Sequence, residues 1–236
     1  MRTAVFLIAL TLAFCGFSAL GVWQVQRLQW KHALIARVDA RIHAAPTPPP
    51  ARNDWPNVSA QRDEYRRVVI EGDYLPNHDT RVQAVTERGP GWWLLTPLRS
   101  DSGDTILVNR GFVPDDWKGD VPPPVGHVRI VGLLRTSEPR GGFLRHNDPA
   151  HDRWYSRDVA AIAQTRGLGT VAPYFIDAGR DAFAPQWPAG GMTVVSFRDQ
   201  HLQYALTWFA LAVLTLYAGW RVFYTSGNVD RTRHER

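Results

Sequence analysis

One histidine stands where its side chain could bind a cofactor. His201 directly precedes the apolar stretch Leu202–Trp220, and an ionisable or metal-binding side chain at the start of a membrane helix is costly to leave without a role. Helical spacing places it on a face of mostly small residues: Ala205, Trp208, Ala212, Thr215 and Gly219. A flat macrocycle could lie on such a face with its iron on the imidazole, because neutral imidazole is a common haem ligand.

The same small side chains have a second interpretation, in which they serve only helix packing. A matching face in the N-terminal apolar stretch is formed by Ala9, Ala13 and Gly16. Small residues let two membrane helices approach closely, and His201 would then be a hydrogen-bonding residue at the membrane surface. Spacing alone favours this packing interpretation over haem ligation.

Residues 146–152 form a second polar stretch, with two histidines and two aspartates of the kinds that bind metals. Their spacing matches no pair of ligands on one helix face, and Pro149 prevents a regular helix. A solvated turn is therefore predicted. The sequence also lacks the G-x-S-x-G and H-E-x-x-H motifs of hydrolases, so we expect no enzymatic activity.

Two apolar stretches must position these residues. Residues 3–22 carry no charge, and about 20 helical residues span the roughly 30 Å of a bilayer's hydrocarbon core. Leu202–Trp220 is less apolar, but it has aromatic residues near both ends, where such rings settle at the membrane surface. Each stretch predicts a membrane helix, the first of them uncleaved because its apolar run is longer than that of a signal peptide.

Two membrane helices place both termini on one side of the membrane, and the flanking charges disagree about which side. A cytoplasmic C-terminus is favoured by Arg221, Arg231, Arg233 and Arg236. The opposite arrangement is favoured by Arg27, Lys31, Arg37 and Arg41. Long loops cross the membrane largely regardless of charge, so we expect cytoplasmic termini and a periplasmic domain. Because the first span begins at residue 3, with no space for a mitochondrial transit peptide, a bacterial inner membrane is expected.

The expected divisions follow from these spans and from the prolines after the first of them. They are an N-terminal transmembrane helix (1–26), a helical extension with a proline-rich linker (27–56), a periplasmic domain (57–199), a C-terminal transmembrane helix (200–223) and a cytoplasmic tail (224–236). The helical extension is predicted because apolar residues continue to recur at helical spacing after the span.

The domain has the pattern of short strands between turn residues. Strands are predicted at 65–71, 80–85, 92–98, 105–108, 128–134 and 174–176. One helix is predicted over 156–165, with Ser156 or Asp158 as its cap and with Val159, Ile162 and Ala163 as its apolar face. This pattern predicts a β-rich α+β domain, built as a small antiparallel sheet or partly open barrel and flanked by the two transmembrane helices.

Cysteine and charge content narrow the possible partners. The single cysteine, Cys15, lies in the first apolar stretch, so the domain can form neither a disulfide nor a thiolate metal site. The net charge of +5 does not indicate nucleic-acid binding, because the arginines are scattered and several flank the apolar stretches. Membrane lipid is an expected partner, and nucleic acid is not.

Six blocks of the sequence resemble the surfeit-locus family of cytochrome oxidase assembly factors. The first lies at the end of the N-terminal apolar stretch, where residues 21–31 are similar to the signature G-x-W-Q-x-x-R-x-x-W-K. The others are Tyr65–Val68, Ile106–Pro114, Trp154–Asp158, Phe175–Asp177 and His201–Phe209. The blocks follow the family's order over nearly the whole chain.

The resemblance implies a non-enzymatic role, in which the protein helps haem a to reach, or stay in, subunit I of cytochrome c oxidase during assembly. It also implies that a histidine at the place of His201 takes part in haem a binding, which reverses the preference from spacing. We take His201 as the candidate iron ligand, and as candidate haem-binding residues His201, Tyr204, Trp208, Trp23 and Arg27. The alternative is a scaffold that stabilises nascent subunit I without haem.

One position departs from the family's pattern. Asp199 stands two residues before His201, where the family usually has asparagine. A carboxylate there could orient the imidazole through a hydrogen bond, or could repel the propionates of haem. The sequence favours neither effect.

Two further patterns have structural interpretations that we prefer. Trp23, Arg27, Trp30 and Lys31 share one helix face, where lipid anchoring is favoured over contact with haem propionates. In the block Val108–Phe112, Gly111 permits an unusual backbone angle, and a structural corner is favoured over a contact with a partner.

Overall fold

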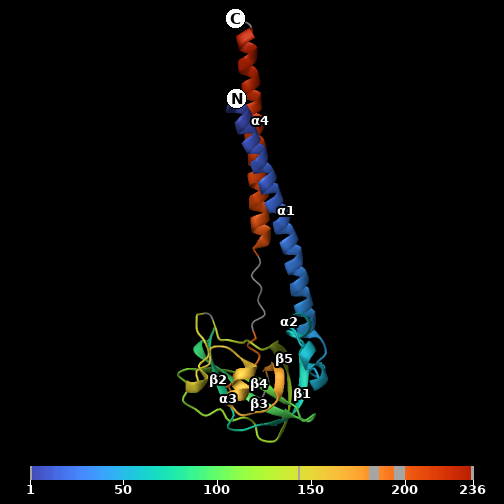
Figure 1. Cartoon of the computed structure of the whole chain (residues 1–236), viewed down its shortest axis with the longest axis vertical. Coiled ribbons are helices and arrows are strands. Elements are labelled where there is room, and N and C mark those ends of the chain that lie inside the picture. Colours follow the sequence, from blue (N-terminus) through green and yellow to red (C-terminus); the bar gives the residue numbers. More distant parts are fainter. Residues whose placement is uncertain (1, 143, 181–185, 194–199, 235–236) are drawn as a thin grey trace. The chain divides into compact units, whose positions relative to one another are not determined.

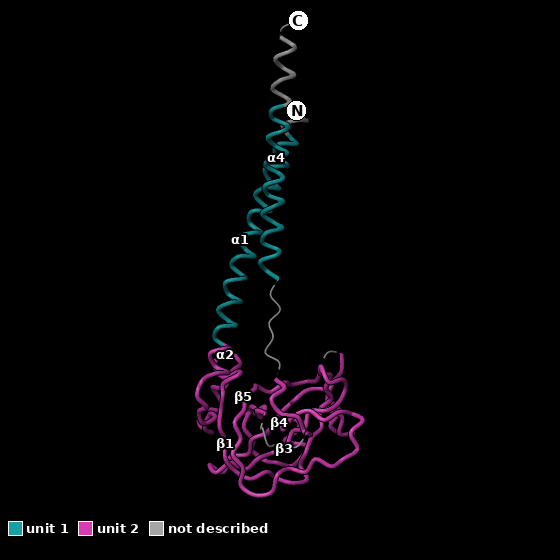
Figure 2. The backbone as a smooth tube through the Cα atoms, turned by 180° about the vertical axis from the view of Figure 1, so that it is seen from behind, with its two compact units in different colours: residues 1–37, 196–236 teal, residues 38–195 magenta. Residues whose placement is uncertain are grey.

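The computed structural model describes residues 2–142, 144–180, 186–193 and 200–234 (Figure 1). The chain divides into two compact units, one made of residues 1–37 and 196–236 and the other of residues 38–195 (Figure 2). The first unit is helical and the second is rich in strands, as the sequence predicts.

The helical unit contains most of α1 (Arg2–His43) together with α4 (His201–His234). By length and composition, both are candidate membrane spans, over Val5–His43 and His201–Tyr224, with mean hydropathies of 2.3 and 1.4 in their most apolar windows. This confirms the two predicted spans. The expected extension is also present, because α1 continues to His43 and ends just before Pro46, whose ring would break the helix.

The two helices pack through the face of α4 that the sequence indicates. Ala205 and Ala212 are almost fully buried, at 2% and 3% exposure, and the ring of Trp208 stacks on Phe17 of α1 with centroids 5.8 Å apart. At Gly21 of α1, a Cβ atom would lie 2.6 Å from the ring of Phe209, so a larger residue there would displace this ring. The small residues of α4 therefore serve the approach of the other helix.

The matching face proposed for α1 is wrong. Ala9 is exposed, a Cβ atom added to Gly16 would meet no atom within 4 Å, and only Ala13 is partly buried. The packed side of α1 passes through Phe17, Gly21 and Gln24 instead, at spacings of one helical turn. A search for small residues at helical spacing misses this side, because Gly21 is its one small residue between Phe17 and Gln24.

In the second unit, the described strands form one sheet. Their bounds are β1 (Arg67–Tyr74), β2 (Thr80–Thr86), β3 (Gly89–Ser100), β4 (Thr105–Pro114), β5 (His127–Thr136) and β6 (Val171–Ala178). The order is β1-β5-β6-β4-β3-β2, and a further pairing of β1 with β3 closes five strands into a barrel-like sheet. β2 stays outside the closed ring, paired with β3. The predicted barrel and all its predicted strands are confirmed.

The pairing is antiparallel except between β4 and β6, which run parallel. β6 is buried on both faces: Tyr174 and Ile176 join one apolar cluster with Val68 and Leu98, while Phe175 joins a second cluster around Trp154. The sequence prediction covers only residues 174–176 of this strand, because Pro173 and Asp177 interrupt its apolar run.

One face of the barrel is covered by α3 (Val159–Thr165). Val159, Ile162 and Ala163 are buried as predicted, and the carboxylate of Asp158 accepts a hydrogen bond from the backbone N–H of Ala161. Asp158 is thus the cap, whereas the hydroxyl of Ser156 bonds to the loop at 138–141.

The proline-rich segment after α1 packs on the barrel. It includes η1 (Arg52–Asn57) and leads into the single turn α2 (Ala60–Asp63). The carbonyl of Pro50 accepts hydrogen bonds from the hydroxyl of Tyr174 at 2.9 Å and from the indole of Trp55 at 3.2 Å. This segment is therefore a fixed part of the barrel unit.

Candidate functional site

His201 is the first residue of α4, and its ring points toward α1. Its Nδ1 lies 2.8 Å from Oε1 of Gln24, a residue that is only 8% exposed. In the tautomer that carries a proton on Nδ1, the imidazole donates to the amide oxygen and has its lone pair on Nε2. Gln24 has no predicted role in the sequence analysis, and the signal that identifies it is a polar amide one turn after Gly21 on the packed side of α1.

The other predicted haem-binding residues lie in two different surroundings. Trp208 is partly buried on the packed face of α4. Tyr204 and Trp23 are 51% and 49% exposed on the outside of the helix pair. Arg27 is also exposed, and its guanidinium carbon lies 5.0 Å from the ring centroid of Trp30, consistent with the shared interfacial face.

The structure limits where a macrocycle could lie. Because α1 covers Ala205 and Ala212, a planar group cannot rest on that face while the helices are packed in this way. His201 still fits the role of an iron ligand. Its imidazole is only partly buried, and Gln24 provides a hydrogen-bond acceptor for Nδ1. Asp199, the position that departs from the family pattern, lies outside the described residues, as does Arg236 of the tail.

The stretch 146–152 forms the predicted turn, which includes η2 (Pro149–His151). Its side chains serve different partners: His151 bonds to Asp148 at 2.8 Å, and His146 bonds to the carbonyl of Arg140 at 3.1 Å. Asp152 accepts from the indole of Trp154 and from Arg166. Elsewhere in the described part, possible metal ligands meet at Glu71, Asp101 and His127, all of them exposed.

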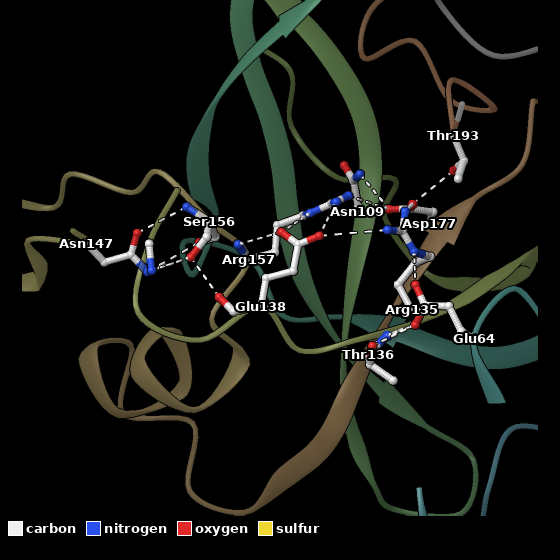
Figure 3. A network of polar contacts seen from close by, with 11 residues as sticks. Glu64, Asn109, Arg135, Thr136, Glu138, Asn147, Ser156, Arg157, Asp177 and Thr193 are labelled. Carbon is white, nitrogen blue, oxygen red and sulfur yellow. Dashed lines mark hydrogen bonds and ion pairs between the residues drawn. The ribbon is translucent and has the colours of Figure 1, made fainter. Parts of the chain in front are cut away.

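The barrel contains a polar network that sequence analysis missed (Figure 3). At its centre is Asp177, whose side chain is only 5% exposed. Its Oδ1 accepts from Asn109 at 2.8 Å and from Arg157 at 3.3 Å, and its Oδ2 accepts from Arg135 and Thr193, both at 2.9 Å. Each carboxylate oxygen thus has two donors, which offsets the cost of burying the charge.

Two further carboxylates hold the arginines of this network. Nε of Arg135 donates to Glu64 at 2.7 Å, and Nε of Arg157 donates to Glu138 at 3.1 Å. Burial alone would lower the pKa of Arg135, but Asp177 and Glu64 outweigh it and raise this pKa. Burial alone would raise the pKa of Glu138, but its bonds with Arg157 hold this pKa below its ordinary value. Both groups are therefore charged at neutral pH.

Strand register brings the network together. Asn109 on β4 and Asp177 on β6 are direct partners in the parallel pair, and Arg135 on β5 is opposite Phe175 on β6. The ring of Phe175 lies beneath the guanidinium of Arg157, 4.7 Å from centroid to carbon. Three of the sequence blocks that carry the family resemblance thus meet at one place.

A model of the SURF1 family matches residues 11–213, a range that includes parts of both helices and the whole barrel. Surfeit locus protein 1 of mouse is 37% identical over 227 residues, covering 86% of this chain and 71% of the mouse protein. The human protein of the same name is 36% identical over 228 residues, covering 86% and 73%. The SURF1-like protein of Monosiga brevicollis is 33% identical over 217 residues, covering 84% and 79%.

Proposed function

This chain belongs to the SURF1 family, and from that premise we propose that it is an assembly factor for cytochrome c oxidase that binds haem a or passes it to subunit I. His201 is the iron ligand in this proposal. The role is that of a carrier or chaperone and not of an enzyme, so the chain's residues need only hold, orient and release the cofactor.

The observation that supports the ligand role is the hydrogen bond between His201 and Gln24. A metal-ligating histidine almost always donates its other ring N–H to an acceptor, which fixes the tautomer and orients the ring. Gln24 supplies such an acceptor at 2.8 Å from a nearly buried position. An amide buried on an apolar helix is costly unless it is hydrogen-bonded, so the pair has a reason to persist.

The remaining candidate residues have positions that suit a cofactor at the His201 end of the helix pair. When bound, haem a would supply an iron centre, and the imidazole of His201 would hold it. Arg27 lies three residues after Gln24 and therefore on the same side of α1, where its guanidinium is available to a propionate. Trp23 and Tyr204 offer exposed rings on the neighbouring turns, whereas Trp208 already stacks on Phe17 and would contribute to the packing beside the cofactor.

The proposal includes a location and an orientation. The protein would lie in a bacterial inner membrane with its barrel in the periplasm and both termini in the cytoplasm. Support comes from the even number of candidate spans among the described helices and from the long segment between them, which crosses membranes largely regardless of charge. Membrane lipid and subunit I of the oxidase are the proposed partners.

Replacing His201 by alanine tests the proposal. The full chain, purified from cells that make haem a, is expected to carry haem a, and His201→Ala should carry at least about tenfold less, because the residue that would hold the iron is lost. Visible absorption spectra and a haem extraction assay measure the content. His32→Ala, which alters an exposed histidine of α1, is the matched control and should retain haem. A wild-type chain without haem would contradict the proposed function.

The hydrogen-bond partner gives a second prediction. Gln24→Leu should weaken haem retention about tenfold and shift the absorption bands, because loss of an outer-shell partner typically costs that much in metal sites. Gln26→Leu changes the same side-chain type at an exposed position two residues further and should have no effect. If both variants behave alike, Gln24 does not orient the ring.

A second candidate function is the scaffold that stabilises nascent subunit I without haem. The observation that favours it is the closed packing of α1 on Ala205 and Ala212, since the helix pair is complete without a cofactor. Under this function, His201→Ala would leave the yield of assembled oxidase unchanged in cells. Measuring oxidase yield alongside haem content therefore separates the two functions.

A further inference from the structure

A cavity of about 510 Å³ lies against the polar network of the barrel unit. Its floor includes Asn109, Arg135, Arg157, Asp177 and Thr193, which are labelled in Figure 3. Its rim is formed by the turn between β2 and β3 and by residues 191–193. The volume is typical of sites for small molecules. The function proposed above makes no use of this cavity.

The carboxylate on the floor of the cavity is already satisfied by donors from the described residues. Both oxygens of Asp177 already accept two hydrogen bonds, and the amide of Asn109 donates to Asp177 while accepting from the backbone N–H of Gly111. A ligand in contact with these residues therefore meets an acceptor that is already satisfied. Cations and donor-rich ligands gain little here.

The guanidiniums, in contrast, have N–H groups to spare. Each carries five, of which Arg135 directs two at carboxylates within hydrogen-bond distance and Arg157 directs three. Nη2 of Arg135 lies 3.8 Å from Glu138, beyond that distance. The two side chains remain 15% and 13% exposed, and both line the cavity. Anionic oxygen is the group that matches these planar donors.

The charges around the cavity limit how much negative charge its ligand can carry. Of the described residues that line the cavity, the positive ones are Arg88, Arg135, Arg157 and Arg180, and the negative ones are Glu87 and Asp177. Glu64 and Glu138, which pair with the two floor arginines, balance the remaining two positive charges, so the site has no large excess of positive charge. A single negative charge suits such a site better than the double charge of phosphate.

The walls complete the description of the ligand. Val85, Trp93 and Met192 give the cavity an apolar side, and Val85 is 83% exposed at the rim. We propose that this cavity binds a small organic acid, with its carboxylate on the guanidiniums of Arg135 and Arg157 and its apolar part against Trp93. The floor arginines are held rigid by Asp177, Glu64 and Glu138, so little is lost in ordering them when the ligand binds.

Isothermal titration of the full chain in detergent tests this site with three probes. N-acetyl-leucine, which has a carboxylate on an apolar group, should bind at least about tenfold more tightly than N-acetyl-leucinamide, which differs only in that charge. It should also bind more tightly than inorganic phosphate. Failure of N-acetyl-leucine to bind would overturn the proposal, as would equal binding by the amide or by phosphate.

Variants locate the binding. Arg157→Lys keeps the positive charge but loses the planar guanidinium, which can donate two parallel hydrogen bonds to a carboxylate. It should weaken the binding of N-acetyl-leucine about tenfold or more. Because that change could disturb the network, Arg88→Gln at the exposed rim provides an independent test and should weaken binding several-fold. Arg81→Gln removes an exposed arginine of β2 that does not line the cavity, and it should bind as the wild type does. Equal loss with Arg81→Gln would place the interaction elsewhere and overturn the assignment.

Discussion

Asp177→Ala is expected to lower the free energy of unfolding of the barrel by about 3–5 kcal/mol, because it leaves two partly buried guanidiniums without their shared carboxylate. Asp177 is 5% exposed and accepts from Asn109, Arg135, Arg157 and Thr193. Urea unfolding of the full chain in detergent, followed by circular dichroism in the β region, measures the change. The slope of the transition should stay the same, since the surface exposed on unfolding changes little.

Two control variants separate the charge from the shape. Asp177→Asn keeps the shape and one acceptor oxygen, and it should cost less than the alanine variant, because part of the hydrogen bonding survives. Asp73→Ala removes an aspartate of β1 that is 63% exposed, and it should change stability by less than about 0.5 kcal/mol. An alanine variant at 177 that costs no more than this control would show that the network does not hold the barrel together.

Gly111→Ala is expected to cost about 2–4 kcal/mol, through backbone strain and overlap together. Gly111 has a φ of +135°, and a Cβ atom there would lie 2.3 Å from the carbonyl carbon and oxygen of Ala189. Phe112 pairs with Ala189 through two backbone hydrogen bonds, so the segment at 189 cannot move away without losing them. The melting temperature of the full chain should fall by several degrees.

A second glycine distinguishes strain from overlap. Gly103 has a φ of +82°, but no atom lies within 4 Å of its Cβ position. Gly103→Ala should therefore lower the free energy of unfolding by about 1 kcal/mol, through backbone strain alone. If the two variants cost the same, the close approach of Ala189 to Gly111 contributes nothing, and the structural corner favoured from the sequence has a different cause.

The two proposals rest on residues in different units of the chain. The network lies in the barrel unit, whereas His201 and Gln24 lie in the helical unit. Haem content should respond to changes at His201 and Gln24, and binding of the small acid should respond to changes at Arg88 and Arg157. Each of these proposals can fail without the other, since the residues that carry them are different.

The amino-acid sequence by itself determined the elements. Charge-free runs of bilayer length predicted α1 and α4, short runs between turn residues predicted the strands, and a capping residue at 156 or 158 with an apolar face predicted α3. These features are local, because a membrane span, a strand or a cap depends on residues within a few turns of one another. The small-residue face of α4 followed from helical spacing for the same reason.

The tertiary structure alone decided which residues meet. Spacing proposed Ala9 and Gly16 for the packed side of α1, but the partner helix selected Gly21 and Gln24. Asn109 and Asp177 became neighbours through the parallel register of β4 and β6, which no local pattern of either strand encodes. Contacts between distant segments depend on register and on which face each element buries. Those choices are made by the packing of the whole chain, and so they are not visible in any short stretch of it.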